Sequence, residues 1–144
     1  MTELTDTLRR TFEAIASRPV PHDWTESAPP LAEYRNLADL VGAIRDWTDV
    51  EVSDGLVRAL LPLARNDDHA ALVLLEGTVR LAISQVGGTT SRQFRDELIT
   101  DLACVILESE DLLGLDRLVD RISRRAYRRT KRRMSADSQW AERA

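Results

Sequence analysis

Apolar residues recur along the chain at the three- and four-residue spacing of helices that bury one face. Such stripes predict helices over 2–17 and 31–47, and a third that begins at the N-cap candidate Ser53. Asn66-Asp67-Asp68 supplies caps for a fourth helix that continues to about Val86. The residues predicted to face the core are Leu4, Leu8, Phe12 and Ile15; Leu37, Leu40, Val41, Ile44 and Trp47; Leu56, Val57, Leu60, Leu61 and Ala64; and Leu72, Leu75, Val79 and Ile83.

Two more helices are predicted in the second half of the chain. Gly87-Gly88 closes the fourth helix, and Thr90-Ser91-Arg92-Gln93 has the form of a capping box that opens the fifth. A sixth helix follows Glu110-Asp111. The fifth helix is predicted to bury Phe94, Leu98, Leu102, Val105 and Ile106, with Asp96, Glu97, Asp101 and Glu108 toward solvent, and the sixth to bury Leu115, Leu118, Val119, Ile122 and Ala126.

These elements predict an all-α fold, a compact bundle of about five or six helices with a basic, projecting C-terminal helix. The 144 residues suit one domain. We divide the chain into an N-terminal helix and Pro-rich linker (1–30), a helical domain (31–134) and a flexible tail (135–144) that carries Trp140. The proline-rich linker leaves the first helix as a loosely attached arm, with Trp24 tucked against the body. Pro62 is expected to bend or shorten the third helix.

The net charge of −4 conceals a strong asymmetry. Residues 1–120 hold 11 arginines and 22 acidic residues, whereas residues 121–133 hold eight basic residues and no acid. Electrostatic potential is set locally, because charges are screened over about 8 Å in physiological salt. The basic segment therefore says more about binding partners than the average charge does.

The basic residues gather on one flank of the predicted last helix. Beyond Ala126, arginines replace the apolar residues of the buried stripe, so this end is expected to leave the core and to be basic on nearly every side. The flank itself, at 100° per residue, holds Arg117, Arg121, Arg124, Arg128 and Arg132. The candidate nucleic-acid-binding residues are these five with Arg125, Tyr127, Arg129, Lys131 and Arg133.

Phosphate is the ligand that best fits this chemistry. Guanidinium groups bind phosphate oxygens in pairs, and each contact releases condensed counterions. Lys131 is the only lysine in the chain, and arginine alone adds bidentate recognition and stacking on bases. The residues therefore favour DNA as the partner. An acidic protein surface and a merely solvated charged face are the alternatives.

The order of elements over 55–134 resembles region 2 of bacterial sigma-70-type factors, the helical domain that binds the polymerase clamp and recognises the promoter −10 element. The likeness rests on LVRALLPLARNDDHAALVLLEGTVRLAI, RDELITDLACVILES and GLDRLVDRISRRAYRRTKRR. It implies that Asp96, Glu97 and Asp101 contact RNA polymerase or another transcription protein. It also implies that Arg117, Arg121, Arg124, Arg125 and Arg128 face promoter DNA.

Two departures from that family change what the resemblance implies. The family's aromatic cluster, which captures unpaired bases, is reduced to Tyr127, and no second helix-turn-helix domain follows. We therefore expect a region-2-like DNA-binding or polymerase-associated regulator. Strand melting is not expected of it.

The remaining features argue against an enzyme, a metal site or a cofactor. His22 and His69 are isolated, and Cys104 stands alone at an apolar helical position, as packing thiols do. No apolar run reaches bilayer length and no secretion signal opens the chain, so a cytoplasmic protein without membrane contact is expected. The alternative function is a protein-interaction module, which would use Trp47 in its surface and form a homodimer or bind an acidic partner.

Overall fold

The computed structural model describes the backbone of residues 4–86 and 91–143, and the side chains of 4–86 and 91–136. Over these ranges all the regular secondary structure is α-helical or 3₁₀-helical, with no strand, and the helices pack as a bundle. The predicted all-α fold is confirmed. The elements are α1 (Leu4–Glu13), α2 (His22–Ser27), η1 (Pro29–Glu33), α3 (Leu37–Ile44), α4 (Val50–Ala64), α5 (Asp68–Val86), α6 (Arg92–Glu108), η2 (Glu110–Leu112) and α7 (Leu118–Arg143).

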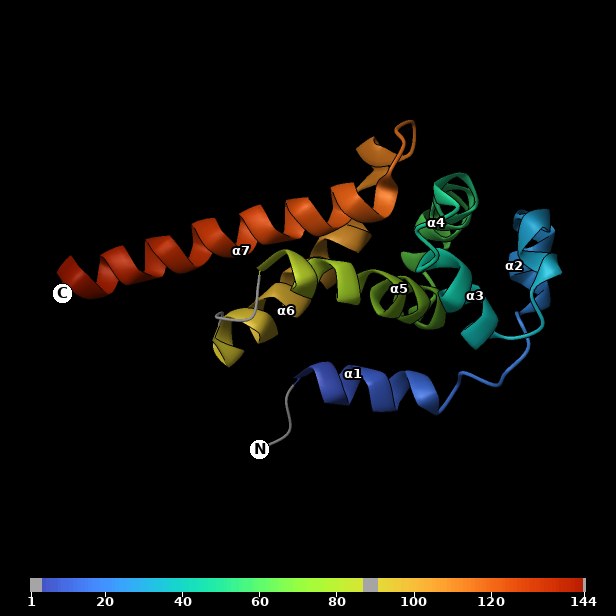
Figure 1. Cartoon of the computed structure of the whole chain (residues 1–144), viewed down its shortest axis with the longest axis horizontal. Coiled ribbons are helices and arrows are strands. Elements are labelled where there is room, and N and C mark those ends of the chain that lie inside the picture. Colours follow the sequence, from blue (N-terminus) through green and yellow to red (C-terminus); the bar gives the residue numbers. More distant parts are fainter. Residues whose placement is uncertain (1–3, 87–90, 144) are drawn as a thin grey trace.

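Helix α5 lies in the middle of the bundle and contacts α1, α3, α4, α6 and α7 (Figure 1). A helix enclosed from several sides has no single inward stripe, because almost every direction is core. The predicted inward face is therefore only partly right: Val79 is buried, whereas Leu72, Leu75 and Ile83 are half-buried. The buried positions run around the helix and are Ala70, Val73, Leu74, Glu76, Gly77, Thr78, Val79 and Ala82.

Gly77 lets α3 approach α5 closely. A Cβ atom at this position would lie 2.7 Å from Cγ2 of Ile44, which is fully buried. Glycine in a helix interior costs roughly 1 kcal/mol relative to alanine. Here that cost is offset by the packing of Ile44 against the bare backbone.

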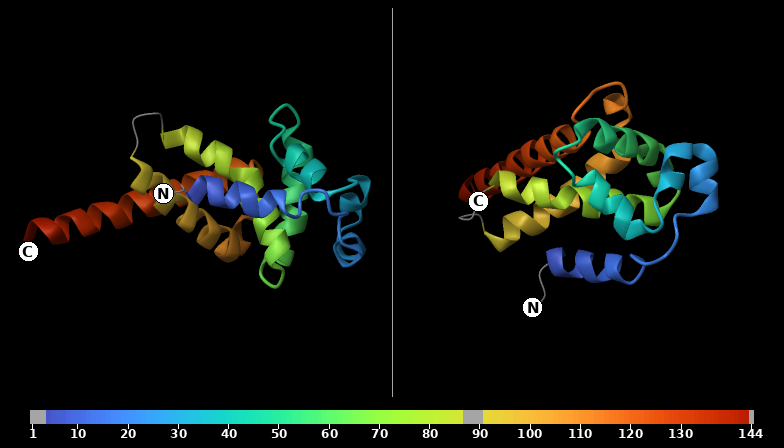
Figure 2. Two further views of the ribbon diagram at one scale, coloured as in Figure 1. Left: turned by 90° about the horizontal axis from the view of Figure 1, so that it is seen from below. Right: turned by 45° about the vertical axis from the view of Figure 1, so that its right-hand side comes forward.

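The N-terminal segment is ordered against the body, so two expectations are wrong. The proline-rich stretch, expected as an irregular linker, contains α2 and η1, and α1 packs along α5 and α6 with Leu8, Phe12 and Ile15 buried (Figure 2). The expected burial of Trp24 is confirmed, and its Nε1–H donates to Oδ2 of Asp67 at 2.7 Å.

The predicted helix starts are right in type and shifted in place. Asp49 caps α4 by accepting from the Val52 N–H, while Ser53, the predicted cap, lies inside the helix and donates to the Ile44 carbonyl. Ser91 caps α6 through the Phe94 N–H. Pro62 does not shorten α4, which continues to Ala64. Thr90 and the predicted Gly87-Gly88 break lie outside the described residues.

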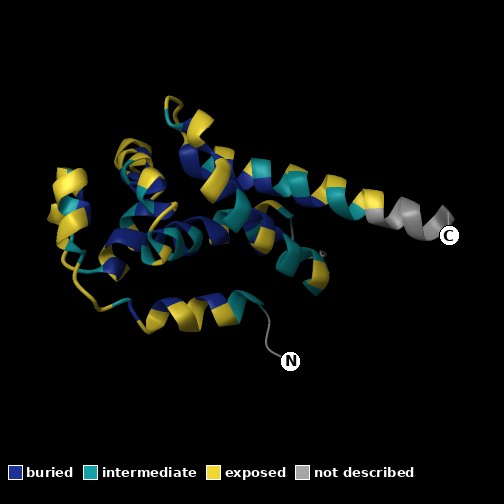
Figure 3. Ribbon diagram, turned by 180° about the vertical axis from the view of Figure 1, so that it is seen from behind, coloured by how far each residue is buried: buried dark blue, intermediate teal, exposed yellow. Residues whose placement is uncertain are grey.

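Two apolar residues of the predicted core are exposed, Trp47 at 56% and Leu115 at 41%. Helix α3 ends at Ile44 and α7 starts only at Leu118, so each residue lies in a loop rather than on a buried helical stripe. The core itself, dark blue in Figure 3, runs through the bundle and along the first half of α7.

Helix α7 is longer than predicted. Its backbone is helical as far as Arg143, including most of the segment expected as a flexible tail, and its last turns extend beyond the ends of α5 and α6 (Figure 1). The side chain of Trp140 is outside the described set. In the described part of the chain, no helix combines the length and the apolar character that a membrane span requires.

Candidate nucleic-acid interface

Helix α4 fixes where α7 begins. The carboxylate of Asp54 accepts the backbone N–H groups of Arg117 and Leu118, both at 2.8 Å, and so caps the N-terminus of α7 from a neighbouring helix. One turn later, Arg58 donates to the carbonyls of Leu113 and Leu115 at 2.8 and 2.9 Å. These contacts hold the loop before α7 in place, which sets the direction of the basic helix.

Arg117 is the one non-glycine residue of the described chain with a positive φ, at 50°. This left-handed conformation costs an L-residue roughly 1–2 kcal/mol. The Asp54 cap compensates for the strain by holding the Arg117 N–H. The Arg117 side chain remains exposed and forms no hydrogen bond or salt bridge among the described residues. The pKa of Asp116 is lowered chiefly by a hydrogen bond from Arg121 and also by the nearby charge of Arg117.

The first turns of α7 and the loop before it form a groove of about 410 Å³. We call it the arginine groove. The gathering of arginines on one side of the last helix, predicted from the wheel, is confirmed for those at its start. The groove is lined by Arg117, Arg121, Arg124, Arg125 and Arg128 together with Leu112, Leu115 and Asp120.

Three groove arginines have carboxylate partners at the surface. Arg121 pairs with Asp116 at 3.0 Å, Arg124 with Asp120 at 3.1 Å, and Arg125 with Asp111 in a two-pronged contact at 2.8 and 2.9 Å. Hydrogen bonds from Arg125 and Arg121 hold the pKa of Asp111 and of Asp116 below the usual aspartate value. Exposed pairs of this kind add little to stability, because water solvates both charges.

The expectation that α7 is basic on nearly every side beyond Ala126 is wrong. Arg129 pairs with Asp101 at 3.2 Å and Glu108 at 2.9 Å, and Arg133 pairs with Glu97 at 2.7 Å and Asp101 at 2.8 Å. Arg129 donates a hydrogen bond to Glu108, and Arg133 donates to Asp101 and Glu97. These hydrogen bonds raise the pKa of both arginines. The arginines that replace the apolar stripe therefore continue the α6–α7 contact by ion pairing.

Asp101 is the centre of this contact. Its side chain is only 4% exposed and accepts hydrogen bonds from the Thr130 hydroxyl at 2.7 Å and from Arg133, besides its contact with Arg129. The prediction that Asp101 faces solvent is wrong, because Asp101 lies on the side of α6 that packs against α7. We name Asp101, Glu97, Arg129, Arg133 and Thr130 the α6–α7 clasp.

The acids predicted to contact a partner, Asp96, Glu97 and Asp101, already have contacts within this chain. Asp101 is buried and Glu97 is paired with Arg133. Asp96 is half-buried and accepts the backbone N–H of Leu4 from α1. These three acids thus hold α1 and α7 to α6 in this structure.

Three further cations of α7 form no salt bridge among the described residues, Arg128 at the end of the groove and Lys131 and Arg132 beyond it. Arg128 and Arg132 are exposed and have no carboxylate partner among the described residues, and Lys131 is exposed with its Nζ 6.0 Å from the Tyr127 ring centre. Arg128, Lys131 and Arg132 line one shallow depression with Ser135 and Ala136. Tyr127 is half-buried with its ring edge-on to Phe94, so it is not an open stacking platform.

Trp47 was expected both in the core and, in the alternative function, as part of a protein-interaction surface, and the core placement is wrong. Its helical spacing from Ile44 placed it in the core, yet it lies in the loop between α3 and α4, close to the start of α7. The only signal for this position was Asp46-Trp47-Thr48-Asp49, a run of turn- and cap-forming residues that ends α3 early.

Within the described ranges, no three histidine, cysteine or acidic side chains gather as a metal site would require. We compared the chain with protein-family models, with curated proteins and with solved structures, and none of these comparisons found a match. The resemblance to sigma region 2 therefore remains a prediction made from the sequence motifs.

Proposed function

We propose that this protein binds nucleic acid through the phosphate backbone, along the arginine groove and the unpaired cations beyond it. The observation that carries the proposal is the continuous cationic strip on one face of α7. Arginines 117, 121, 124, 125 and 128 line the groove, and Lys131 and Arg132 follow within one further turn. Among the described side chains, three carboxylates pair with the groove arginines, those of Asp111, Asp116 and Asp120.

The length of the strip suits a nucleic-acid backbone. From Arg121 to Arg132 a helix rises about 16 Å at 1.5 Å per residue, which matches roughly five nucleotide steps of 3.4 Å. The loop is anchored by α4, so the first arginines are presented from a rigid base. Each phosphate contact releases counterions, and this release offsets the loss of the weak surface ion pairs.

The biological setting follows from the resemblance to sigma region 2. On that basis we propose a cytoplasmic, transcription-associated regulator rather than an enzyme, with DNA as the first partner to test. Contact with RNA polymerase through Asp96 and Glu97 belongs to the same proposal. It would require those acids to exchange their present partners, Leu4 and Arg133.

A charge-reversal experiment with a matched control tests the proposal. Arg124→Glu with Arg128→Glu should abolish binding of a fluorescein-labelled duplex, measured by anisotropy, while helicity measured by circular dichroism stays intact. Arg9→Glu with Arg10→Glu changes the net charge equally but lies on exposed positions of α1, across the molecule from α7 (Figure 1). Unchanged binding in the α7 variant, or equal loss in both variants, contradicts the assignment.

A second candidate ligand is an acidic protein segment. The observation in its favour is that Arg121, Arg124 and Arg125 already bind carboxylates in the folded chain. A labelled poly-Glu peptide in the same anisotropy assay separates the two, because nucleic-acid binding predicts that duplex DNA displaces the peptide at equal charge concentration.

A further inference from the structure

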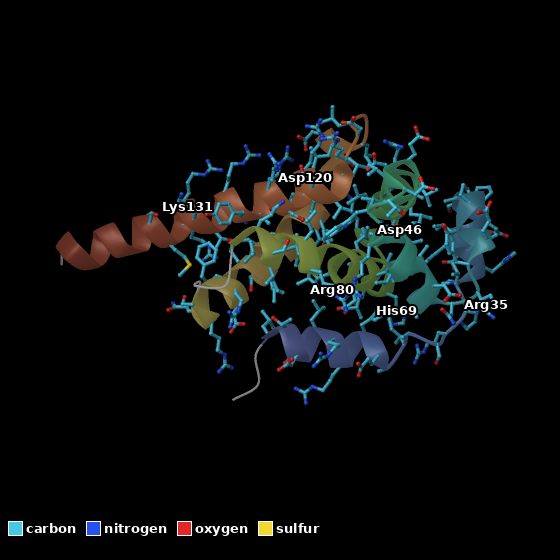
Figure 4. All side chains as sticks on the ribbon, viewed as in Figure 1. Arg35, Asp46, His69, Arg80, Asp120 and Lys131 are labelled. Atoms are coloured by element: carbon cyan, nitrogen blue, oxygen red, sulfur yellow. The ribbon has the colours of Figure 1, made fainter. Side chains whose placement is uncertain are left out.

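A cavity of about 290 Å³ opens beside the arginine groove, between the α3–α4 loop, α5 and the start of α7. It lies at the lower end of the range found for small-molecule pockets, which is room for one planar ring system. Figure 4 labels Asp46 and Asp120, two of its lining residues, on the loop and on α7. Arg117, Asp120 and Arg124 line both this cavity and the arginine groove.

The apolar part of the cavity offers a flat ring surface. Trp47, 56% exposed, lines it with Val50, Leu81 and Val119. An exposed indole beside apolar neighbours is a stacking surface without a partner, and aromatic rings such as nucleobases stack on tryptophan.

The polar part of the cavity holds three carboxylates, those of Asp46, Asp54 and Asp120, and two guanidinium groups, those of Arg117 and Arg124. The carboxylates already accept hydrogen bonds within the chain, so the guanidinium groups are the charged side-chain donors that the cavity offers to a ligand. The Arg117 side chain forms no hydrogen bond or salt bridge among the described residues, and Arg124 is 68% exposed in its pair with Asp120. Asp54 accepts two backbone N–H groups, Asp46 accepts the Thr48 N–H and hydroxyl, and Asp120 accepts from Gln85 and Arg124.

We propose that this cavity is a nucleotide site, in which a base stacks on Trp47 and the 5′-phosphate binds Arg117 and Arg124. A stacking ring lies next to two guanidinium groups, one without a salt bridge in the described part of the chain and one in an exposed salt bridge with Asp120. This arrangement matches a ring joined to a phosphate, the chemistry of a nucleotide. Such a ligand comes either as a free mononucleotide or as an unpaired nucleotide of a strand. The site shares two arginines with the proposed nucleic-acid surface, but its occupation by a mononucleotide does not depend on duplex binding.

The test follows the Trp47 indole N–H signal by NMR while the full-length protein is titrated with ligands. The probes are the four nucleoside 5′-monophosphates, the matching nucleosides, inorganic phosphate and a single-stranded tetranucleotide. At least one monophosphate should shift the Trp47 signal and bind at least tenfold more tightly than its nucleoside or inorganic phosphate. Tighter binding of the tetranucleotide than of the monophosphates identifies a strand as the source of the nucleotide, and the reverse identifies a free mononucleotide.

Variants separate the cavity from the strip. Trp47→Ala and Arg117→Gly should each weaken monophosphate binding by at least tenfold, whereas Arg132→Ala, outside the cavity, should leave it unchanged. Trp47→Ala should leave duplex affinity within twofold, so that the two proposals fail separately. Equal binding of phosphate and nucleotide, wild-type affinity in Trp47→Ala, or no shift up to millimolar nucleotide overturns the nucleotide site.

Discussion

The α6–α7 clasp predicts that one buried carboxylate determines whether α7 stays on the bundle. The perturbation is Asp101→Asn, which keeps the side-chain volume and removes the charge. Asp101 accepts from Thr130 at 2.7 Å and Arg133 at 2.8 Å, and it contacts Arg129 at 3.2 Å. In the variant, an amide NH₂ group faces these donors, and two guanidinium groups lose part of their counter-charge.

The magnitude follows from burial on the two sides of the contact. Hydrogen bonds to charged groups contribute about 1.5–3 kcal/mol each, and breaking a fully buried ion pair costs about 3–5 kcal/mol. Asp101 is 4% exposed, but Arg129 and Arg133 are 40% and 39% exposed, so water solvates the stranded cations. We therefore expect a loss of about 2–4 kcal/mol in the free energy of unfolding, below the sum for three buried contacts.

Urea unfolding followed by circular dichroism at 222 nm measures this loss, with the slope of the transition unchanged. Asp120→Asn is the matched control, because Asp120 pairs with Arg124 at the surface and should cost less than about 1 kcal/mol. If Asp101→Asn is no more destabilising than Asp120→Asn, the clasp does not hold α7 and our reading of Arg129 and Arg133 fails.

Three further predictions concern packing, backbone strain and titration. Gly77→Ala should destabilise by about 1–3 kcal/mol in the same urea assay, since the new methyl group meets Ile44, and a stabilised variant would contradict that packing. Arg117→Gly should raise stability by up to about 1 kcal/mol because glycine adopts a positive φ freely, and a loss would show that no strain was relieved. The hydrogen bond from Arg125 lowers the Asp111 pKa, so the stabilisation from this pair is complete above about pH 4 and is lost as pH falls through the folded-state pKa. Carbon-13 NMR titration should find the Asp111 pKa below its usual value and restored in Arg125→Met, and an ordinary value in the wild type would contradict the pair.

Periodicity was sufficient to predict the helices with one buried face. The apolar core of α4, from Leu56 to Ala64, was read correctly from the spacing. Four of the five core residues predicted for α6 are buried, Leu98, Leu102, Val105 and Ile106, whereas the burial of Ile99 and Asp101 was not predicted. Spacing did not define α5, because a central helix is buried on several sides and loses the amphipathic signal. The spacing also predicted too long a helix at α3, which turn-forming residues end at Ile44, before Trp47.

The candidate site was predictable in composition and only partly in geometry. Local spacing placed Arg121, Arg124 and Arg128 on one flank, and the structure gathers them in one groove. Nothing in local spacing indicated that Arg129 and Arg133 pair with α6, since that contact joins residues 21 to 36 positions apart. A run of like charges looks solvated from sequence alone, because its counter-charges come from another helix.

The central claim is that the cations of α7 fall into two groups. The groove arginines, Lys131 and Arg132 are unpaired within the described residues or paired only at the surface and bind phosphate, whereas Arg129 and Arg133 are held in the α6–α7 clasp. The most direct test is the salt dependence of duplex affinity for the wild type, Arg128→Gln and Arg129→Gln. Five phosphate contacts predict a slope of log affinity against log salt near −4.5, at about 0.9 per contact. The account predicts that Arg128→Gln reduces this slope by about 0.9 while Arg129→Gln leaves it unchanged. A wild-type slope near zero, or equal changes in both variants, would contradict it.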